Sequence, residues 1–224
     1  MRKSYILSIL GLLVVLAVAL GLYFFYPLQK IVEGLPDKAR NLPKEAQGIY
    51  EQKLEEAQGY LNTLDIKNPN YNNLAMNTYM YMAQQYFGLG RLELSKQYYE
   101  KALALDSRQQ QLWVGLAEVQ VDAGELSAAQ ETLKKAIDIN PAVADVWIRF
   151  ITLSQSMGMQ KQDIMQLLEE ALEKTKRHAD VLIKAAQFYE QQGSKHEALK
   201  FWKEALERDP GNILIEQEIK RLEK

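Results

Sequence analysis

The 224-residue chain contains no cysteine and only two histidines. The lack of cysteine excludes disulfide bonds, thiolate metal sites, thiol nucleophiles and a lipid-bearing N-terminal cysteine. His178 and His196 have no second ligand at helical spacing, so we expect both to be solvated rather than to bind a metal. A phosphate-binding glycine loop and a nucleophile motif are also missing. These absences argue against an enzyme, and we predict no cofactor and no metal site.

The chain also lacks an excess of charge of one sign. Lysine and arginine number 27 against 29 aspartate and glutamate, for a formal net charge of −2. No bulk positive field therefore attracts nucleic acid, which we exclude as a partner. Hydrophobic residues make up 47% of the chain, which is too apolar for disorder and indicates a packed core.

A long apolar run is present near the N-terminus. Residues 5–26, YILSILGLLVVLAVALGLYFFY, contain no charged residue. As a helix they would extend about 33 Å, against about 30 Å for the hydrocarbon of a bilayer. The preceding tail, residues 1–4, is basic, and Tyr23 and Tyr26 stand at the far end, where aromatic rings suit the interface. The pattern predicts one transmembrane helix, with the N-terminus in the cytoplasm and the C-terminal part outside it.

Two other interpretations of this run remain open, a cleaved signal peptide and a buried soluble helix. Ala17 and Ala19 form an A-x-A site for cleavage, but the apolar run continues past Ala19 to residue 26. We therefore favour an uncleaved signal anchor. Residues 27–43, PLQKIVEGLPDKARNLP, hold three prolines and a glycine without a clear period, and they predict a tether.

Beyond the tether a pattern recurs every 34 or 35 residues. Its glycines are Gly90, Gly124, Gly158 and Gly193. Its alanines are Ala102, Ala136, Ala171 and Ala205. A period of this length with helical composition predicts a solenoid of helix-turn-helix units.

Within each copy, the order aromatic, Leu, small, Tyr, Gly, small, aromatic, Ala and Pro resembles the tetratricopeptide repeat family. The resemblance covers residues 76–212, divided into copies at 76–109, 110–143, 144–178 and 179–212. It implies an all-α solenoid of about four helix pairs. Residues 44–75 are expected to add a degenerate N-terminal helix and a connection, as a half-unit, and residues 213–224 a C-terminal capping helix. This solenoid would lie behind the single transmembrane helix.

The pattern assigns physical roles to particular residues. Ala117 and Ala129 are expected where the two helices of copy two touch, and Gly124 is expected to end the first of them. Pro141 should stop the second helix and can sit in the first turn of the next. The expectation is that small residues lie where helices meet.

Copy three departs from the pattern. Ile151 and Ile164 stand where both helices should be small, Ser154 replaces the tyrosine and Lys176 replaces the proline. Two branched side chains in a close-packed seam should push the helices apart. Ordinary drift of a repeat with local repacking is the alternative.

The resemblance also implies an inner face of the first helices, which lines a concave groove. We define this inner face by Asn77, Met80, Gln84, Gln111, Val114, Glu118, Asp122, Asp145, Ile148, Thr152, Asp180, Ile183, Gln187 and Glu190. It carries one apolar residue per copy and five carboxylates, with Arg149 and Lys184 only at its edge. The family's lysine and asparagine clamp for acidic C-termini is absent, since those positions hold Met80, Gln84, Val114 and Glu118. The inner face therefore predicts a basic or amphipathic peptide partner, unless it is merely solvated or supports neighbouring helices.

Three functions are consistent with these features. The first is a membrane-tethered scaffold that binds a protein or peptide in its groove, with envelope protein assembly or quality control as candidate settings. The second is a self-assembling structural module, for which Ala17 and Gly21 supply a small-xxx-small pair in the membrane segment. The third is an accessory subunit of an enzyme complex. The sequence leaves the oligomeric state and the identity of the partner open.

Overall fold

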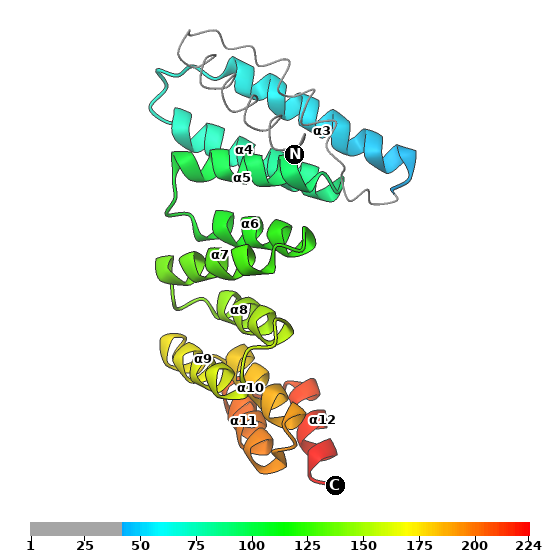
Figure 1. The fold of residues 1–224 in the computed structure, drawn as a ribbon, viewed down its shortest axis with the longest axis vertical. Coiled ribbons are helices and arrows are strands. Elements are labelled where there is room, and N and C mark those ends of the chain that lie inside the picture. The colour runs from blue at the N-terminus through cyan, green and yellow to red at the C-terminus, as the bar shows by residue number, and fades with distance from the viewer. Residues whose placement is uncertain (1–41) are drawn as a thin grey trace, which may run out of the picture.

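The computed structural model describes residues 42–224, which are all-helical and contain no strand. These residues form ten helices: α3 (Lys44–Thr63), α4 (Tyr71–Gly88), α5 (Leu92–Leu105), α6 (Gln110–Asp122), α7 (Leu126–Ile139), α8 (Ala144–Ser156), α9 (Lys161–Lys174), α10 (Ala179–Gln191), α11 (Lys195–Arg208) and α12 (Ile213–Leu222). Figure 1 shows them stacked along one axis, from α3 at one end of the molecule to α12 at the other. The predicted all-α solenoid is confirmed for these residues.

Consecutive helices pack in pairs, α4 with α5, α6 with α7 and α10 with α11. The second helix of copy two shows why. In α7 the buried residues Ala129, Leu133, Ala136 and Ile137 follow a spacing of three or four, so they form one stripe along the helix. Short connections bring each second helix back alongside the first. The buried stripe then faces α6 on one side and the next pair on the other.

Gly124 ends α6 in the left-handed conformation, with a φ of +78°. Its N–H donates to the Val121 carbonyl at 3.0 Å, and the N–H of Glu125 donates to the Gln120 carbonyl at 2.8 Å. These two bonds satisfy carbonyls that the end of a helix leaves open, in a conformation that strains any residue with a Cβ. The equivalent glycines of the other copies also have a positive φ: Gly90, Gly158 and Gly193. The predicted role of glycine is confirmed.

Small residues lie where the paired helices touch. Ala117 of α6 is 1% exposed and Ala129 of α7 is fully buried, within one core cluster. In copy one the approach is close enough for the hydroxyl of Ser95, on α5, to donate to the Ala83 carbonyl of α4 at 2.8 Å. A larger side chain at either position would separate the two backbones. The predicted use of small residues is confirmed.

The helices of copy three are further apart than those of the other copies. Ile151 and Ile164 occupy the positions of Ala117 and Ala129, and both are buried in the same core cluster. Helix α9 approaches α8 much less closely than α7 approaches α6, and its approach to α10 is also loose (Figure 1). Branched side chains fill the wider seam, so the predicted separation agrees with the structure.

Copy three also ends differently. Where the pattern has a proline, Lys176 and the following Arg177 adopt left-handed conformations with φ of +54° and +56°. The N–H of Arg177 donates to the Leu172 carbonyl at 2.7 Å, and its Nη2 donates to Glu204 Oε2 of α11 at 2.7 Å. A sharp reversal fixed by an ion pair therefore replaces the proline stop.

Pro141 lies in the connection between α7 and α8, before α8 begins at Ala144. The expectation that it sits in the first turn of the next helix was therefore wrong. Its carbonyl accepts a hydrogen bond from Trp147 Nε1 at 2.8 Å. A turn at residues 141–142 and the N-cap Val143 separate the proline from the new helix.

A single helix covers each end of the array. Helix α3 packs on α4 through Leu54 and Ala57, its two buried residues. Helix α4 begins at Tyr71, so its first turn lies within residues 44–75, which were expected to hold only a degenerate helix and a connection. At the other end, α12 packs on α11 through the predicted stripe of Ile215, Ile219 and Leu222.

Among residues 42–224, no helix combines the length and the apolar character that crossing a membrane requires. The predicted basic tail 1–4, the predicted membrane helix 5–26 and nearly all of the predicted tether 27–43 lie outside the described residues.

Candidate functional site

The predicted inner face is carried by the first helices of the four copies, α4, α6, α8 and α10. Most of its polar side chains are exposed: Asn77, Gln84, Gln111, Glu118, Asp145, Thr152, Asp180 and Gln187. Asp122 and Glu190 are half-buried. Equivalent positions on stacked helices place these side chains in a row along the array.

The apolar members of the inner face are half-buried: Met80, Val114, Ile148 and Ile183. Each packs against a core cluster with part of its surface and leaves the rest accessible. These residues therefore support neighbouring helices and also present an apolar stripe.

Cations compensate part of the acidic charge of the inner face. Arg149 Nε donates to Asp145 Oδ2 at 2.7 Å, and this bond, with the nearby charge of Glu118, raises the pKa of Arg149. Because both groups are well exposed, the pair contributes little to stability. The inner face is consequently less acidic than the count of carboxylates suggested.

Glu190 is bonded within the chain. Trp202 Nε1 donates to Glu190 Oε1 at 2.6 Å, and Arg221 of α12 donates to Glu190 Oε2. The same guanidinium donates to Glu218 Oε2 through Nε at 2.7 Å, and the two carboxylates together raise the pKa of Arg221. Sequence reasoning offered Glu190 to a partner, whereas in the structure its charge attaches α12 to α10.

A buried tyrosine underlies the inner face between copies one and two. Tyr99 of α5 is 5% exposed and packs against Gly115 of α6, where a Cβ would lie 2.4 Å from its side chain. Burial raises the pKa of Tyr99 to about 12, with a contribution from Glu118, while a hydrogen bond to Gln84 opposes the shift. Sequence reasoning missed Tyr99. The sequence signal for Tyr99 was Gly115, a glycine at a position that carries a large side chain in the other copies.

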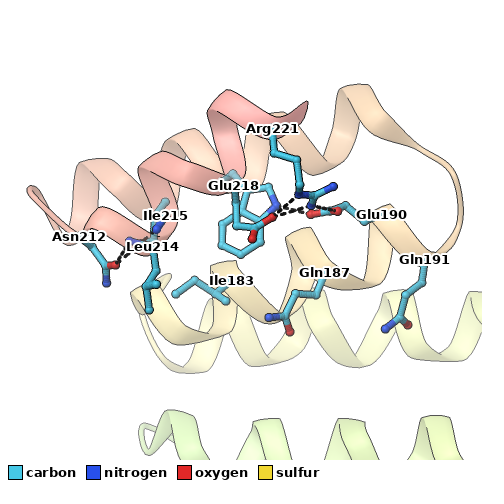
Figure 2. A pocket seen from close by; sticks show the side chains of 10 residues that line it. Ile183, Gln187, Glu190, Gln191, Asn212, Leu214, Ile215, Glu218 and Arg221 are labelled. Carbon is cyan, nitrogen blue, oxygen red and sulfur yellow. Dashed lines mark hydrogen bonds and ion pairs between the residues drawn. The ribbon is translucent and has the colours of Figure 1, made fainter. Parts of the chain in front are cut away.

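A hollow of about 490 Å³ lies between α10 and α12, at the C-terminal end of the inner face. Its apolar lining comes from Ile183, Trp202, Leu214 and Ile215. Its polar lining comes from Gln187, Glu190, Gln191, Asn212, Glu218 and Arg221. Figure 2 shows Leu214 of α12 directed toward Ile183 of α10, with the ion pairs of Arg221 further along the two helices.

Sequence reasoning treated α12 only as a cap and missed its part in this hollow. The signal was present, because Leu214 follows Asp180 by 34 residues and Arg221 follows Gln187 by 34 residues. Helix α12 thus stands where the first helix of a fifth copy would stand.

The two histidines have separate surroundings. His178 is the N-cap of α10, and its Nδ1 accepts a hydrogen bond from the Asp180 N–H at 3.3 Å. His196 is exposed on α11. In the part of the chain that the structure describes, no three His, Cys, Asp or Glu side chains gather in a way that could hold a metal ion.

Two segments of the chain match sequence models of the tetratricopeptide repeat, residues 86–148 and residues 179–212. Residues 149–178, which hold most of copy three, lie between these segments.

Solved structures share the fold. The C-terminal part of a TPR repeat-containing protein from Cytophaga hutchinsonii has a TM-score of 0.58 at 17% identity, covering 80% of this chain and 69% of that one. MamA has a TM-score of 0.55 at 21% identity, covering 74% of this chain and 92% of its own. YrrB, described as a TPR protein with an unusual peptide-binding site, has a TM-score of 0.51 at 18% identity, covering 87% and 98%. Residues 86–148 and 179–212 thus match the tetratricopeptide repeat, and the described residues share the helical fold of these solved structures.

Proposed function

We propose that this protein is a scaffold that binds a polypeptide partner along its inner face. One observation carries the proposal: each of four successive first helices presents a half-buried apolar residue beside exposed polar residues at the same positions. Apolar contacts supply affinity to an extended or helical segment, and polar groups around them fix its register. The peptide-binding site named for YrrB supports the same use of this fold.

The chemistry of the inner face favours a basic or amphipathic segment. Carboxylates from α6, α8 and α10 outnumber the cations at its edge, which are Arg149 and Lys184. Electrostatic complementarity would mainly increase the association rate and select against acidic partners.

We further propose that residues 5–26 anchor the array to a membrane and place it outside the cytoplasm. The tether of residues 27–43 would then reach about 55 Å when fully extended. A scaffold held in this way suits the assembly or quality control of envelope proteins. N-terminal sequencing of the mature protein tests the anchor: we expect the apolar run to be retained, and a chain that begins at Leu20 would contradict it.

The binding function is tested by capturing the partner on the full-length chain, identifying it by mass spectrometry and titrating it against variants. Glu118→Lys with Asp145→Lys should weaken binding most at low salt, because the Debye length shrinks to about 3 Å at 1 M. Ile148→Ser should act mainly on the dissociation rate. The matched control is Glu131→Lys with Asp138→Lys, the same charge change on exposed positions of α7. Unchanged affinity in both inner-face variants would exclude the inner face.

Self-assembly is the second candidate function, because Ile213 and Leu214 leave an exposed apolar patch on α12. Size-exclusion chromatography of the full-length chain at several concentrations separates the two. A scaffold predicts one concentration-independent species, whereas assembly that grows with concentration would favour the structural module.

A further inference from the structure

We propose that the hollow between α10 and α12 is an anchor pocket that takes one large apolar side chain of the bound polypeptide, while a basic side chain of the same segment lies over Asp180. This inference rests on the proposed function and adds to it the place where binding is anchored and the chemistry of the bound motif.

The inner face extends onto α12. Leu214 takes the position of Asp180, and Arg221 takes the position of Gln187, each one repeat later. Helix α12 therefore contributes a fifth row to a face that the four copies define. The hollow lies between the fourth and fifth rows, so a segment bound along the inner face would pass over it.

Leu214 is unusual for its position. The four copies carry only polar residues there, Asn77, Gln111, Asp145 and Asp180, whereas Leu214 is a leucine that is 73% exposed. Its neighbour Ile215, which is 1% exposed, provides the packing of α12 on the array. Folding therefore does not require an apolar side chain at residue 214, but an apolar contact with a partner does.

The hollow has the dimensions and lining of an anchor site. Its volume of about 490 Å³ lies within the usual range for ligand pockets, roughly 300–1,000 Å³, and exceeds the volume of any single side chain. Ile183, Trp202 and Leu214 supply the apolar surface (Figure 2). The amides of Gln187 and Gln191 line it and can both donate to and accept from the backbone of an extended segment.

The rim of the hollow carries a net negative charge. Arg221 is held between Glu190 and Glu218, so two carboxylates balance one guanidinium and leave one negative charge. A second copy of this chain that docked through its own hollow would bring the same negative rim, and like charges oppose such a contact. A basic segment of another polypeptide meets no such penalty, and this complementarity favours a partner with cationic side chains.

The position of Asp180 predicts the motif. The hollow borders α10, the helix that also carries Asp180, and an extended chain advances about 3.3 Å per residue. The expected motif is a large apolar residue with a lysine or arginine within a few positions of it.

The test pans a phage-displayed library of random dodecapeptides against the full-length chain in detergent micelles. Enriched peptides are synthesised with a fluorescent label, and their Kd values are measured by fluorescence anisotropy. We expect the peptides to share the predicted motif, and we expect Leu214→Ser to weaken binding by about tenfold or more, because an apolar side chain loses its contact. The matched control is Ile213→Ser, an adjacent residue that is 67% exposed and does not line the hollow. It should leave the affinity unchanged.

The possible contrary results are distinct. If Ile148→Ser weakens binding and Leu214→Ser does not, the anchor pocket is wrong while the proposed function stands. Equal losses for Leu214→Ser and Ile213→Ser would also overturn the pocket, because the effect would then not depend on the hollow. If Leu214→Ser instead abolishes self-association in sedimentation velocity and spares peptide binding, the occupant is a second copy. Failure to enrich any peptide would contradict the proposed function and the pocket together.

Discussion

Copies two and three follow the same two-helix plan, but they fill the seam between their helices differently. Copy two brings α6 and α7 together over Ala117 and Ala129, whereas copy three holds α8 and α9 apart over Ile151 and Ile164. All four residues are 1% exposed or less. A seam of this fold can therefore be closed by small side chains at short distance or by large ones at greater distance, because a packed interior must be filled in either case.

The copies at the two ends differ from the middle in a second way. Tyr86 stacks on Tyr98 in copy one with ring centroids 5.2 Å apart, and Tyr189 stacks on Phe201 in copy four at 5.3 Å. The equivalent positions hold Gln120 and Thr132 in copy two and Ser154 and Leu167 in copy three, so neither middle copy has an aromatic pair there. Ser154 accepts a hydrogen bond from Gln130 at 2.8 Å. These stacked aromatic pairs thus lie in the first and last copies. The loosest packing lies in copy three, between the segments that match the family.

The largest expected effect concerns the wide seam. Ile164→Ala would restore the small residue of the family pattern but leave a cavity, because α9 is already positioned around a large side chain. We expect the free energy of unfolding to fall by about 2–5 kcal/mol. Urea unfolding followed by circular dichroism measures it, with the exposed Ile213→Ala as control. A gain in stability would instead show that copy three is strained.

The converse substitution tests the narrow seam. Ala129→Leu places a large side chain where α6 and α7 touch, and overpacking of this kind costs about 1–3 kcal/mol. Ala128→Leu is the matched control, since Ala128 is exposed on the same helix. Thermal unfolding should separate the two variants clearly. A melting temperature for Ala129→Leu equal to that of the control would mean that this seam tolerates volume as copy three does.

Replacing Lys176, in the reversal that ends copy three, by glycine should change the stability of the chain. Lys176 has a φ of +54°, which costs a non-glycine residue about 1–2 kcal/mol. Lys176→Gly should relieve this strain and, after the entropy that glycine loses on folding, stabilise the chain by up to about 1 kcal/mol. The control is Glu170→Gly, inside α9, which should destabilise by about 1 kcal/mol. Urea midpoints that shift in the same direction for both variants would contradict the assignment of strain.

The smallest expected effect is the pH dependence of the ion pair between Arg177 and Glu204. The hydrogen-bonded guanidinium of Arg177 holds the pKa of Glu204 below its usual value. Because the folded-state pKa is the lower one, the pair stabilises the fold at neutral pH, and this contribution is lost as pH falls through that pKa. At neutral pH the free energy of unfolding of the wild type should exceed that of Glu204→Gln by at most about 1 kcal/mol. Unfolding measured from pH 7 to about pH 3 should show the gap closing. A gap that is constant with pH would contradict the linkage.

The sequence by itself determined the repeat architecture of this protein. The steps of 34 and 35 residues located the helix pairs, Gly124 and its equivalents located the ends of the first helices, and Ala117 with Ala129 located a seam. These features are local or strictly periodic, so they can be recognised in each copy separately. The departures at Ile151 and Ile164 were also visible, and they correctly indicated wider separation.

Only the tertiary structure decided how the candidate site is completed. Glu190 is compensated by Arg221, 31 residues away, and Arg177 meets Glu204, 27 residues away. Tyr99 lies beneath the inner face because Gly115 of the next helix makes room for it. The sequence named which side chains face the same way, since helical periodicity fixes their direction. It did not fix which charges neutralise one another or where a hollow remains, because both depend on the distances between helices that side chains far apart in the chain set together.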